Sequence, residues 1–299
     1  MRVLVTGGAG FVGARLRARL SAEGVEVHAP PQSELDVADG AALRAAVARV
    51  RPHAVAHLAA LSFVPAAEAD PAAAFRVNFL GVRAVLEALR GEAPAARALI
   101  VSSAAVYGSS ARRFDESAPL RPEGAYARSK AAADLLAGRY AELGLNVVRA
   151  RPFNHTGAGR PAHFVESSLA RQLAAAERAA QRAETSAPLR IGNPDSVRDI
   201  LHVEDVVEAY WRLLQPSTPP GVYNIASGRG VSIRELLELL LARTALRPRM
   251  ETERGRWRPA DALVGDARRL RDATGWQPQR SLPDALAELL DYWRHADAK

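Results

Sequence analysis

A tyrosine and a lysine four residues apart, Tyr126 and Lys130, are the side chains in this sequence whose spacing best suits proton transfer. On a helix this spacing places both on one face, about one turn apart. A free tyrosine has a pKa of about 10, and a nearby positive charge lowers it by favouring the phenolate. Such a phenol can exchange a proton with a carbonyl or alcohol oxygen. A long helix also carries this spacing by chance, so its context must decide.

Lysine is rare in this chain. Of the 40 lysine and arginine residues, only Lys130 and Lys299 are lysines. Where arginine replaces lysine almost everywhere, an internal lysine is expected to serve amine chemistry that a guanidinium cannot supply.

Composition excludes several classes of protein and site. The 299 residues suffice for one large α/β domain or two lobes that share a core. The absence of cysteine excludes disulfides, thiolate catalysis and thiolate metal sites, and we expect no metal. No apolar run reaches the roughly 18 residues needed to cross a bilayer, and the chain opens without a signal pattern. We therefore expect a cytoplasmic protein with no membrane partner.

The net charge of +7 raises the possibility of nucleic-acid binding. The basic residues, however, are scattered along many predicted helices and are not grouped beside aromatic residues that could stack on bases. We expect no nucleic-acid partner. A basic surface still suits an anionic ligand such as a nucleotide.

The first residues predict a dinucleotide-binding turn. A strand over 2–6 (RVLVT) runs directly into GGAGFVG at 7–13, and leucines at helical spacing follow. The glycines fit two frames, one starting at Gly7 and one at Gly8, and both continue through Gly10 and Gly13. In either frame glycine permits a tight turn, close approach of a pyrophosphate, and packing of helix on strand. The helix N-terminus then offers free N–H groups to the phosphates.

The end of the second expected strand, over 25–29, does not decide between NAD and NADP as the cofactor. NAD-specific domains usually end this strand with an acidic residue, and NADP sites often have an arginine there. Here the strand ends in Ala29-Pro30-Pro31, which is neither. Both NAD(H) and NADP(H) remain possible.

Strands alternate with helices along the chain, and this order predicts an α/β fold, a Rossmann-like doubly wound parallel sheet with ligands at the carboxyl ends of its strands. Ser102 and Ser103 end one such strand. A helix is expected over 71–90, and Ser232 is expected to cap a helix that ends near Ala242. We predict a dinucleotide-binding domain over 1–152, with 199–226 returning to it. The predicted substrate lobe takes 153–198 and 227–299.

Nine blocks of sequence occur in the order seen in the extended short-chain dehydrogenases/reductases, the nucleotide-sugar epimerase, dehydratase and reductase group, and the chain resembles that family. The blocks are TGGAGFVG, HLAALSFV, RVNFLGVRAVLEAL, VSSAAVYG, YARSK, RPFNHTGAGR, RDILHVEDVVEAY, VYNIASG and GDARRLRDATGWQP. Within the family, RPFNHTG and RDILHVEDVVEAY are most similar to the reductases of GDP-4-keto-6-deoxy-D-mannose. A GDP-sugar is therefore the favoured substrate, and the family suggests a homodimer formed through the helices around 71–90 and 125–142.

The resemblance implies roles for individual residues. Tyr126 resembles the acid/base, Lys130 the residue that holds the nicotinamide ribose and lowers the tyrosine pKa, and Ser103 the hydroxyl that polarises the carbonyl. The implied cofactor-binding residues, besides Tyr126 and Lys130, are Gly7, Gly10, Phe11, Val12, Gly13, Asp36, Val37, Leu58, Ala59, Ala60, Asn78 and Phe153. The implied substrate-binding residues are Ser62, Val64, Ser103, Asn154, Phe164, Val165, Arg171, Arg198 and Arg258, of which the last two resemble a pair that clasps the diphosphate.

Two departures from the family pattern bear on the reaction. Dehydratases of the family carry an acidic residue two positions after the catalytic hydroxyl, where it removes a proton from carbon. Ala105 stands there in this chain, and an alanine cannot act as a base. The family's usual G-P-G-Q after the Asn-His pair is Gly157-Ala158-Gly159-Arg160, which predicts a less stiff loop and an extra charge near the sugar.

Three hypotheses follow. The first is reduction of the C4 ketone of a nucleotide-linked 4-keto-6-deoxyhexose by NAD(P)H. The second is a nucleotide-sugar 4-epimerase that uses the same side chains with a retained cofactor. The third is a non-enzymatic protein on the same fold, which the intact serine, tyrosine and lysine set argues against.

Overall fold

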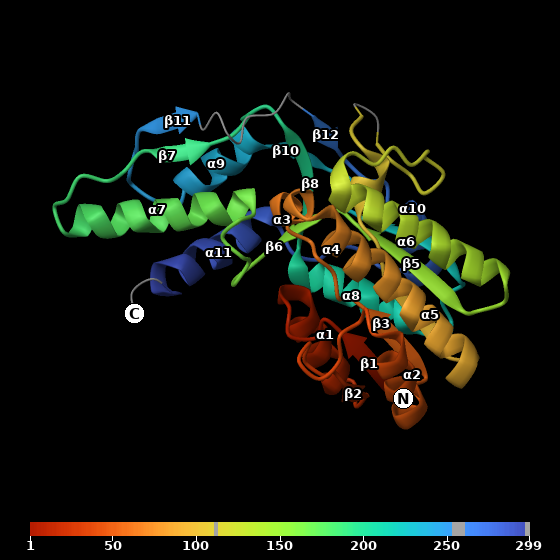
Figure 1. Cartoon of the computed structure of the whole chain (residues 1–299). Helices are drawn as coiled ribbons and strands as arrows, with labels where there is room; N and C mark the ends of the chain where they lie inside the picture. The colour runs from red at the N-terminus through yellow and green to blue at the C-terminus, as the bar shows by residue number, and fades with distance from the viewer. Residues whose placement is uncertain (111–112, 253–260, 297–299) are drawn as a thin grey trace.

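The computed structural model describes residues 1–110, 113–252 and 261–296. Its larger lobe is built on a six-stranded, all-parallel sheet in the order β2-β1-β3-β4-β5-β9 (Figure 1). The strands are β1 (Arg2–Thr6), β2 (Glu26–His28), β3 (Ala54–His57), β4 (Arg97–Val101), β5 (Val147–Pro152) and β9 (Gly221–Ile225). The order reverses between β1 and β3, and ligands of such sheets bind at the carboxyl ends of the strands at this point. The predicted Rossmann-like fold is confirmed.

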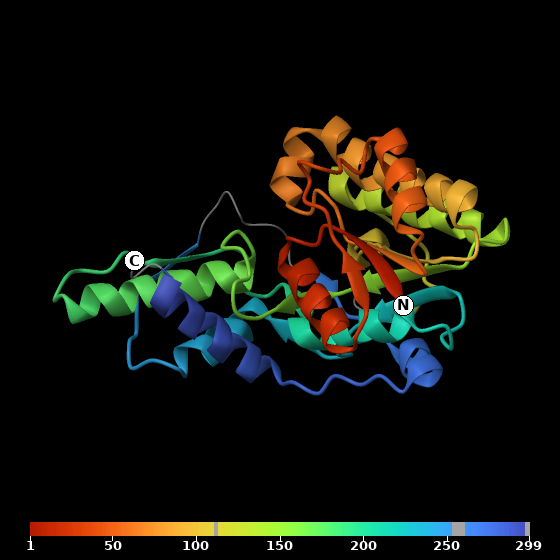
Figure 2. The same cartoon turned by 90° about the horizontal axis from the view of Figure 1, so that it is seen from below.

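Helices cover both faces of this sheet (Figure 2). One face carries α1 (Phe11–Ala22), α8 (Val203–Leu214) and α10 (Arg268–Thr274), and the other carries α2 (Gly40–Val50), α5 (Gly81–Glu92) and α6 (Gly124–Glu142). Each layer encloses its own apolar core. Because the central strands are covered on both sides, they read as near-continuous apolar runs and not as alternating ones.

The helix expected over 71–90 is interrupted. The structure has α3 (Val64–Ala69), α4 (Pro71–Phe75), a π-helical turn η1 (Arg76–Leu80) and then α5. The prediction of one regular helix was therefore wrong at its centre, where a π turn inserts an extra residue. Such turns occur frequently at functional sites, and this one carries Asn78.

The smaller lobe is formed by the second half of the chain. Its four-stranded sheet contains β6 (Asn154–Thr156), β8 (Val197–His202), β10 (Gly230–Ser232) and β12 (Ala262–Leu263), and a separate pair joins β7 (Leu189–Ile191) and β11 (Met250–Thr252). Its helices are α7 (Val165–Gln181), α9 (Ile233–Leu241) and α11 (Leu282–Ala296). Ser232 caps α9 in a capping box with Glu235, as expected. Since β8 belongs to the smaller sheet, the return to the large sheet begins with α8; the predicted division into domains stays a prediction.

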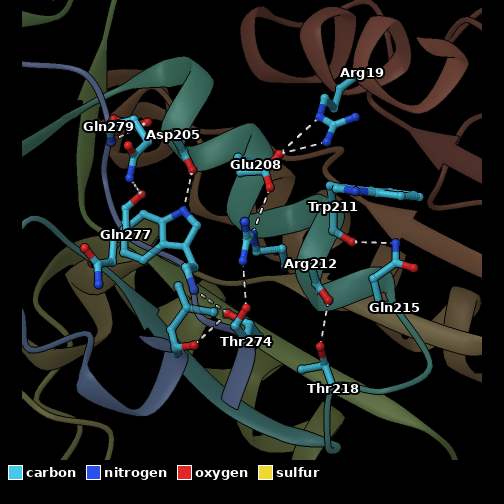
Figure 3. Close-up of polar contacts among 12 residues, drawn as sticks. Arg19, Asp205, Glu208, Trp211, Arg212, Gln215, Thr218, Thr274, Gln277 and Gln279 are labelled. Atoms are coloured by element: carbon cyan, nitrogen blue, oxygen red, sulfur yellow. Dashed lines mark hydrogen bonds and ion pairs between the residues drawn. The ribbon is translucent and has the colours of Figure 1, made fainter. Parts of the chain in front are cut away.

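Helix α8 joins the two halves of the fold (Figure 3). Glu208 accepts from Arg19 of α1 and from Arg212, whose Nη1 donates to the Thr274 carbonyl at 2.7 Å. The buried Trp276 donates from Nε1 to the Asp205 carbonyl at 2.9 Å. These bonds hold the glycine-turn helix α1 and the end of α10 against α8. No helix in the described part of the chain is long and apolar enough to cross a membrane.

Candidate active site

The glycine turn leaves no room for side chains. Gly7 has a φ of +72°, and a Cβ at this position would lie 2.7 Å from the Ala59 backbone nitrogen. A Cβ on Gly13 would lie 2.1 Å from the Gly7 carbonyl oxygen, which also accepts from Gly10 N at 3.1 Å. The turn is thus packed against the end of β3 and opens onto the N-terminus of α1. Its bare backbone fits a pyrophosphate, which needs close approach to N–H groups.

A cationic side chain, Arg17, lies close to the end of β2. A Cβ on Gly8 would lie 2.8 Å from Ala29 Cβ and 3.0 Å from Cδ of Arg17, an exposed residue of α1. The Arg17 side chain therefore runs back along α1, over the turn and beside the strand end. This is where a dinucleotide's adenosine ribose is recognised.

Asp36 and Val37, both implied to lie beside the adenine, differ in exposure. Asp36 is half-buried, and its Oδ2 lies 3.4 Å from Arg76 Nη1. Val37 is buried within the core beneath α2 and α5. Among the other implied cofactor residues, Val12, Leu58 and Ala59 are partly buried against the cores, and Ala60 follows Ala59 in the loop after β3. Phe153 is buried in the core at the end of β5.

The serine, tyrosine and lysine come together at the carboxyl end of β4. Ser103 lies just beyond β4, and its Oγ accepts from Ala105 N at 3.2 Å, which caps a 3₁₀ turn (Ala104–Tyr107). Tyr126 lies in the first turn of α6, and the Ser103 side chain lowers the pKa of its phenol. Lys130, one turn on, is buried, and its Nζ donates to the Val101 carbonyl. The phenol and hydroxyl therefore form one polar pair with the ammonium behind it.

The electrostatics of the tyrosine differ from the expectation. Burial raises the pKa of Tyr126, while the Ser103 hydrogen bond and the positive charge of Arg160 lower it. The effect of Lys130 on this pKa stays a prediction, and the cation whose charge lowers the pKa of Tyr126 here is Arg160. Burial also lowers the pKa of Lys130 to about 8, against the opposing effect of Asp134. At neutral pH the phenol is therefore protonated and the lysine is largely charged.

Asn78 holds the loop after β3 against α6. Its Oδ1 accepts from Leu61 N at 2.8 Å, and its Nδ2 donates to Leu61 O at 3.2 Å and to Ser129 Oγ at 2.9 Å. Ser129 Oγ donates in turn to the Tyr126 carbonyl at 2.8 Å. The side chain is fully buried. Asn78 therefore fixes the distance between the loop bearing Ala59 and Ala60 and the helix bearing the tyrosine.

Arg160 is buried in the loop between β6 and α7. Its guanidinium lies 3.4 Å from the centre of the Phe164 ring and 5.2 Å from that of Phe11. Its Nε lies 3.3 Å from Oε1 of the buried Glu166, and its Nη1 lies 3.5 Å from His155 Nε2. The charge expected near the sugar is thus a fixed, paired one.

The implied substrate residues are spread over several elements. Ser62 and Val64 are exposed at the start of α3, Asn154 opens β6, and Phe164 and Val165 begin α7. Arg171 lies on α7 with its guanidinium 5.6 Å from the Trp293 ring.

The two predicted diphosphate arginines cannot be compared as a pair. Arg198 Nη2 bonds to Asp261 Oδ2 at 2.9 Å, and its Nη1 donates to the Val197 carbonyl. Its fork is thus held by the chain from 261 onward. Arg258 lies outside the described residues. Among the residues that are described, no group of three or more acidic, histidine or cysteine side chains could hold a metal ion.

A family model described as the NAD dependent epimerase/dehydratase family matches residues 3–226. The chain belongs to this family. Its predicted dependence on NAD(H) or NADP(H) is thereby confirmed. The GDP-6-deoxy-D-mannose reductase of Pseudomonas aeruginosa is 36% identical over 98% of this chain and 97% of its own. The UDP-glucose 4-epimerase of Streptomyces lividans is 32% identical over 98% of this chain and 95% of its own.

Solved structures of the family are similar along the whole chain. The structure of RMD from Pseudomonas aeruginosa complexed with NADPH has a TM-score of 0.86 and 34% identity, and it covers 99% of both chains. The Thermus thermophilus UDP-glucose 4-epimerase complex with NAD also has a TM-score of 0.86, with 29% identity, 99% of this chain and 100% of that one. The family thus includes reductases and epimerases on one fold.

Sequence reasoning missed four residues of this site: His155, Glu166, Ser129 and, as a partner of the tyrosine, Arg160. Their roles depend on contacts between segments distant in the chain. The one usable signal was the arginine at 160 in place of glutamine. A glutamate six residues later could have been paired with it only once the loop conformation was known.

Proposed function

We propose that this protein reduces the C4 ketone of a nucleotide-linked 4-keto-6-deoxyhexose with NAD(P)H, with GDP-4-keto-6-deoxy-D-mannose as substrate and a GDP-6-deoxyhexose as product. The observation that carries the proposal is the placement of Ser103 just beyond the carboxyl end of β4, beside Ala105 and in the surroundings that set the pKa of Tyr126. A polarising hydroxyl and an acid are present there, and a carbon base is not. Similarity to the Pseudomonas reductase supports the choice of a GDP-sugar.

In this mechanism Tyr126 protonates the ketone oxygen while Ser103 donates a hydrogen bond to it. When bound, the nicotinamide supplies the hydride. A raised tyrosine pKa suits this direction, because the phenol keeps its proton at neutral pH until the oxygen becomes basic. Lys130, charged and buried behind the phenol, is assigned to the cofactor ribose, and the glycine turn to its pyrophosphate.

The test measures the turnover of the Tyr126→Phe and Ser103→Ala variants with the keto sugar, using NADPH consumption as the readout. Loss of the acid should reduce kcat by about 10²–10⁴-fold, with NADPH binding retained. A fully active Tyr126→Phe variant would refute the proposal. Stabilisation against heat by GDP, but not by UDP, CDP or dTDP at equal concentration, is the expected result for the nucleotide.

An epimerase is the second candidate, favoured by similarity to the Streptomyces and Thermus enzymes. It would oxidise and re-reduce a sugar alcohol through a retained cofactor. An epimerase should purify with bound NAD and interconvert UDP-sugars without added cofactor. A reductase should consume NAD(P)H in proportion to product.

A homodimer, in the cytoplasm, completes the proposal. The large apolar side chains exposed on α4, η1 and α6 are Phe75, Leu80 and Leu135, at 37%, 40% and 61%. Their exposure supports an interface through these helices. Light scattering should give twice the monomer mass, and Leu135→Glu should give the monomer mass.

A further inference from the structure

Glu68, an exposed residue near the end of α3, contacts the start of the helix that carries Tyr126. Its Oε1 accepts a hydrogen bond from the backbone nitrogen of Ala125 at 2.6 Å. Ala125 lies in the first turn of α6, directly before the tyrosine. The bond therefore ties α3 to the residue next to the proposed acid.

Helix α6 has no side-chain cap of its own. The first N–H groups of a helix have no partner within it and are usually satisfied by a side chain at the N-cap. Glu123 occupies this position in α6, and its side chain makes no capping hydrogen bond. Ala125 is buried, and a buried N–H group needs a partner. Glu68 supplies that acceptor from another helix, and a carboxylate also suits the positive end of the helix dipole.

Gly124 permits the close approach of the carboxylate. Its φ is +77°, a left-handed conformation in which glycine is not strained. A Cβ on Gly124 would clash with Oε1 of Glu68. The absence of a side chain at this position is what lets the carboxylate reach the start of α6.

The segment that carries Glu68 is also held at its other end. Asn78 joins the loop before α3 to α6 through its bonds to Leu61 and Ser129. Phe63 is the N-cap residue of α3, and its ring lies 4.3 Å from the His163 ring in the loop between β6 and α7. The segment is therefore fastened to α6 at both ends and packed against the loop that precedes α7.

We propose that Glu68 is a positioning residue for Tyr126: its carboxylate, presented by α3, fixes the start of α6 and so places the phenol relative to Ser62 and Val64. This inference rests on the proposed function, in which Tyr126 protonates the ketone and the start of α3 contacts the substrate. A sugar held against α3 is then in fixed register with the acid, because one hydrogen bond joins the two helices.

The bond acts on the geometry of the acid and not on affinity. Without Glu68 the N–H of Ala125 loses its acceptor, and the first turn of α6, to which the phenol is attached, can fray. The glycine turn and the start of α3 keep their own contacts. We therefore expect kcat to fall while KM and the affinity for NADPH stay near their wild-type values.

The experiment measures kcat, KM, NADPH affinity and melting temperature for three variants of the whole enzyme. Glu68→Ala should lower kcat by about tenfold, since a misplacement of 1 Å can cost about 10²-fold in rate. Glu68→Gln keeps an acceptor oxygen at the same reach and should restore most of the turnover. Glu68→Asp, one methylene shorter, should fall between them, and it carries the test should the alanine variant not fold.

Glu235→Ala is the matched control. Glu235 Oε2 accepts from Ser232 N at 2.8 Å at the start of α9, a helix with none of the proposed site residues. This variant loses the same kind of bond from the same residue type, and its kcat should equal that of the wild type. Wild-type kcat in Glu68→Ala, or an equal fall in both alanine variants, would overturn the inference.

A double-variant cycle tests whether Glu68 acts through Tyr126. Two residues that act as one unit are not additive, so Glu68→Ala should hardly lower the residual turnover of Tyr126→Phe. A full tenfold loss in that background would show that Glu68 acts elsewhere and would also overturn the inference. A fully active Tyr126→Phe variant would instead refute the proposed function, so the two failures are distinguishable.

Discussion

Asn78 and Ser129 share a hydrogen bond of 2.9 Å that joins the π turn to the helix carrying Tyr126. The bond crosses from one element of the active-site wall to another, and the amide is fully buried. Asn78 lies in the π turn and bonds to both Leu61 and Ser129. The position of the acid therefore depends on a residue that lies in a different helix.

Asn78→Ala should lower the free energy of unfolding much more than Ser129→Ala does. Asn78→Ala leaves the Leu61 N–H and C=O without their partner, and a buried unsatisfied group costs about 1–3 kcal/mol. Ser129→Ala removes one hydroxyl and should lower the free energy of unfolding by about 1 kcal/mol. Urea denaturation of both variants measures the difference. Equal losses would contradict the anchoring role.

Two Gly→Ala substitutions should have opposite consequences: the one in the glycine turn should be harmful, and the one in α5 should be stabilising. At Gly13 the new Cβ would lie 2.1 Å from the Gly7 carbonyl oxygen, so α1 must shift, and the affinity for NAD(P)H should fall at least tenfold. Gly91 in α5 has open space around it. Alanine there should stabilise the helix by up to about 1 kcal/mol. Calorimetric titration with NADPH and thermal denaturation test both; unchanged affinity in Gly13→Ala would contradict the packing argument.

Two histidines, the buried His57 and the partly buried His155, should make the protein sensitive to acid. The pKa values of His57 and His155 are both lowered to about 3, chiefly by burial. Between pH 6.5 and 3 the unfolded chain binds protons that the native state excludes, so stability falls as pH falls through this window. The expected slope is about 1.4 kcal/mol per pH unit for each histidine.

The contribution of one histidine to the pH dependence of stability is best measured by comparing a variant with the wild type. Asp199 and Glu116 have raised pKa values and act in the opposite direction, so the total slope is smaller. Urea unfolding at pH 7.5, 6.5 and 5.5 should show a shallower decline for His57→Gln than for wild type. Parallel curves would show that His57 takes up its proton in the folded state as readily as in the unfolded one.

Arg17 should favour NADPH over NADH. Its side chain lies over Gly8, next to Ala29, which follows β2 at the place where NAD-specific domains usually have an acidic residue. Arg17→Ala should weaken binding of 2′,5′-ADP by roughly tenfold or more, as expected for a lost charge-assisted bond. Binding of 5′-ADP should hardly change. Equal effects on the two nucleotides in calorimetric titrations would rule out this role.

Much of the fold could be predicted because its signals are local. The run of strand, glycine turn and helix at 2–20 sets the first βα unit, and Ser232 with Glu235 sets the start of α9. The order of family motifs then placed Ser103, Tyr126 and Lys130 in a common setting. Backbone conformation and burial pattern depend mainly on neighbouring residues, and so they can be predicted from the sequence.

The parts that could not be read depend on where distant segments meet. The Asn78–Ser129 bond spans 51 positions, and a cation whose charge lowers the pKa of Tyr126 comes from position 160. No local sequence signal shows that the Lys130 ammonium donates to the Val101 carbonyl or that Arg160 is buried. The sequence by itself determined the fold class, the glycine turn and the serine, tyrosine and lysine set proposed for the chemistry. Only the tertiary structure decided the acid's electrostatic surroundings, because these depend on burial and on charges brought close by folding.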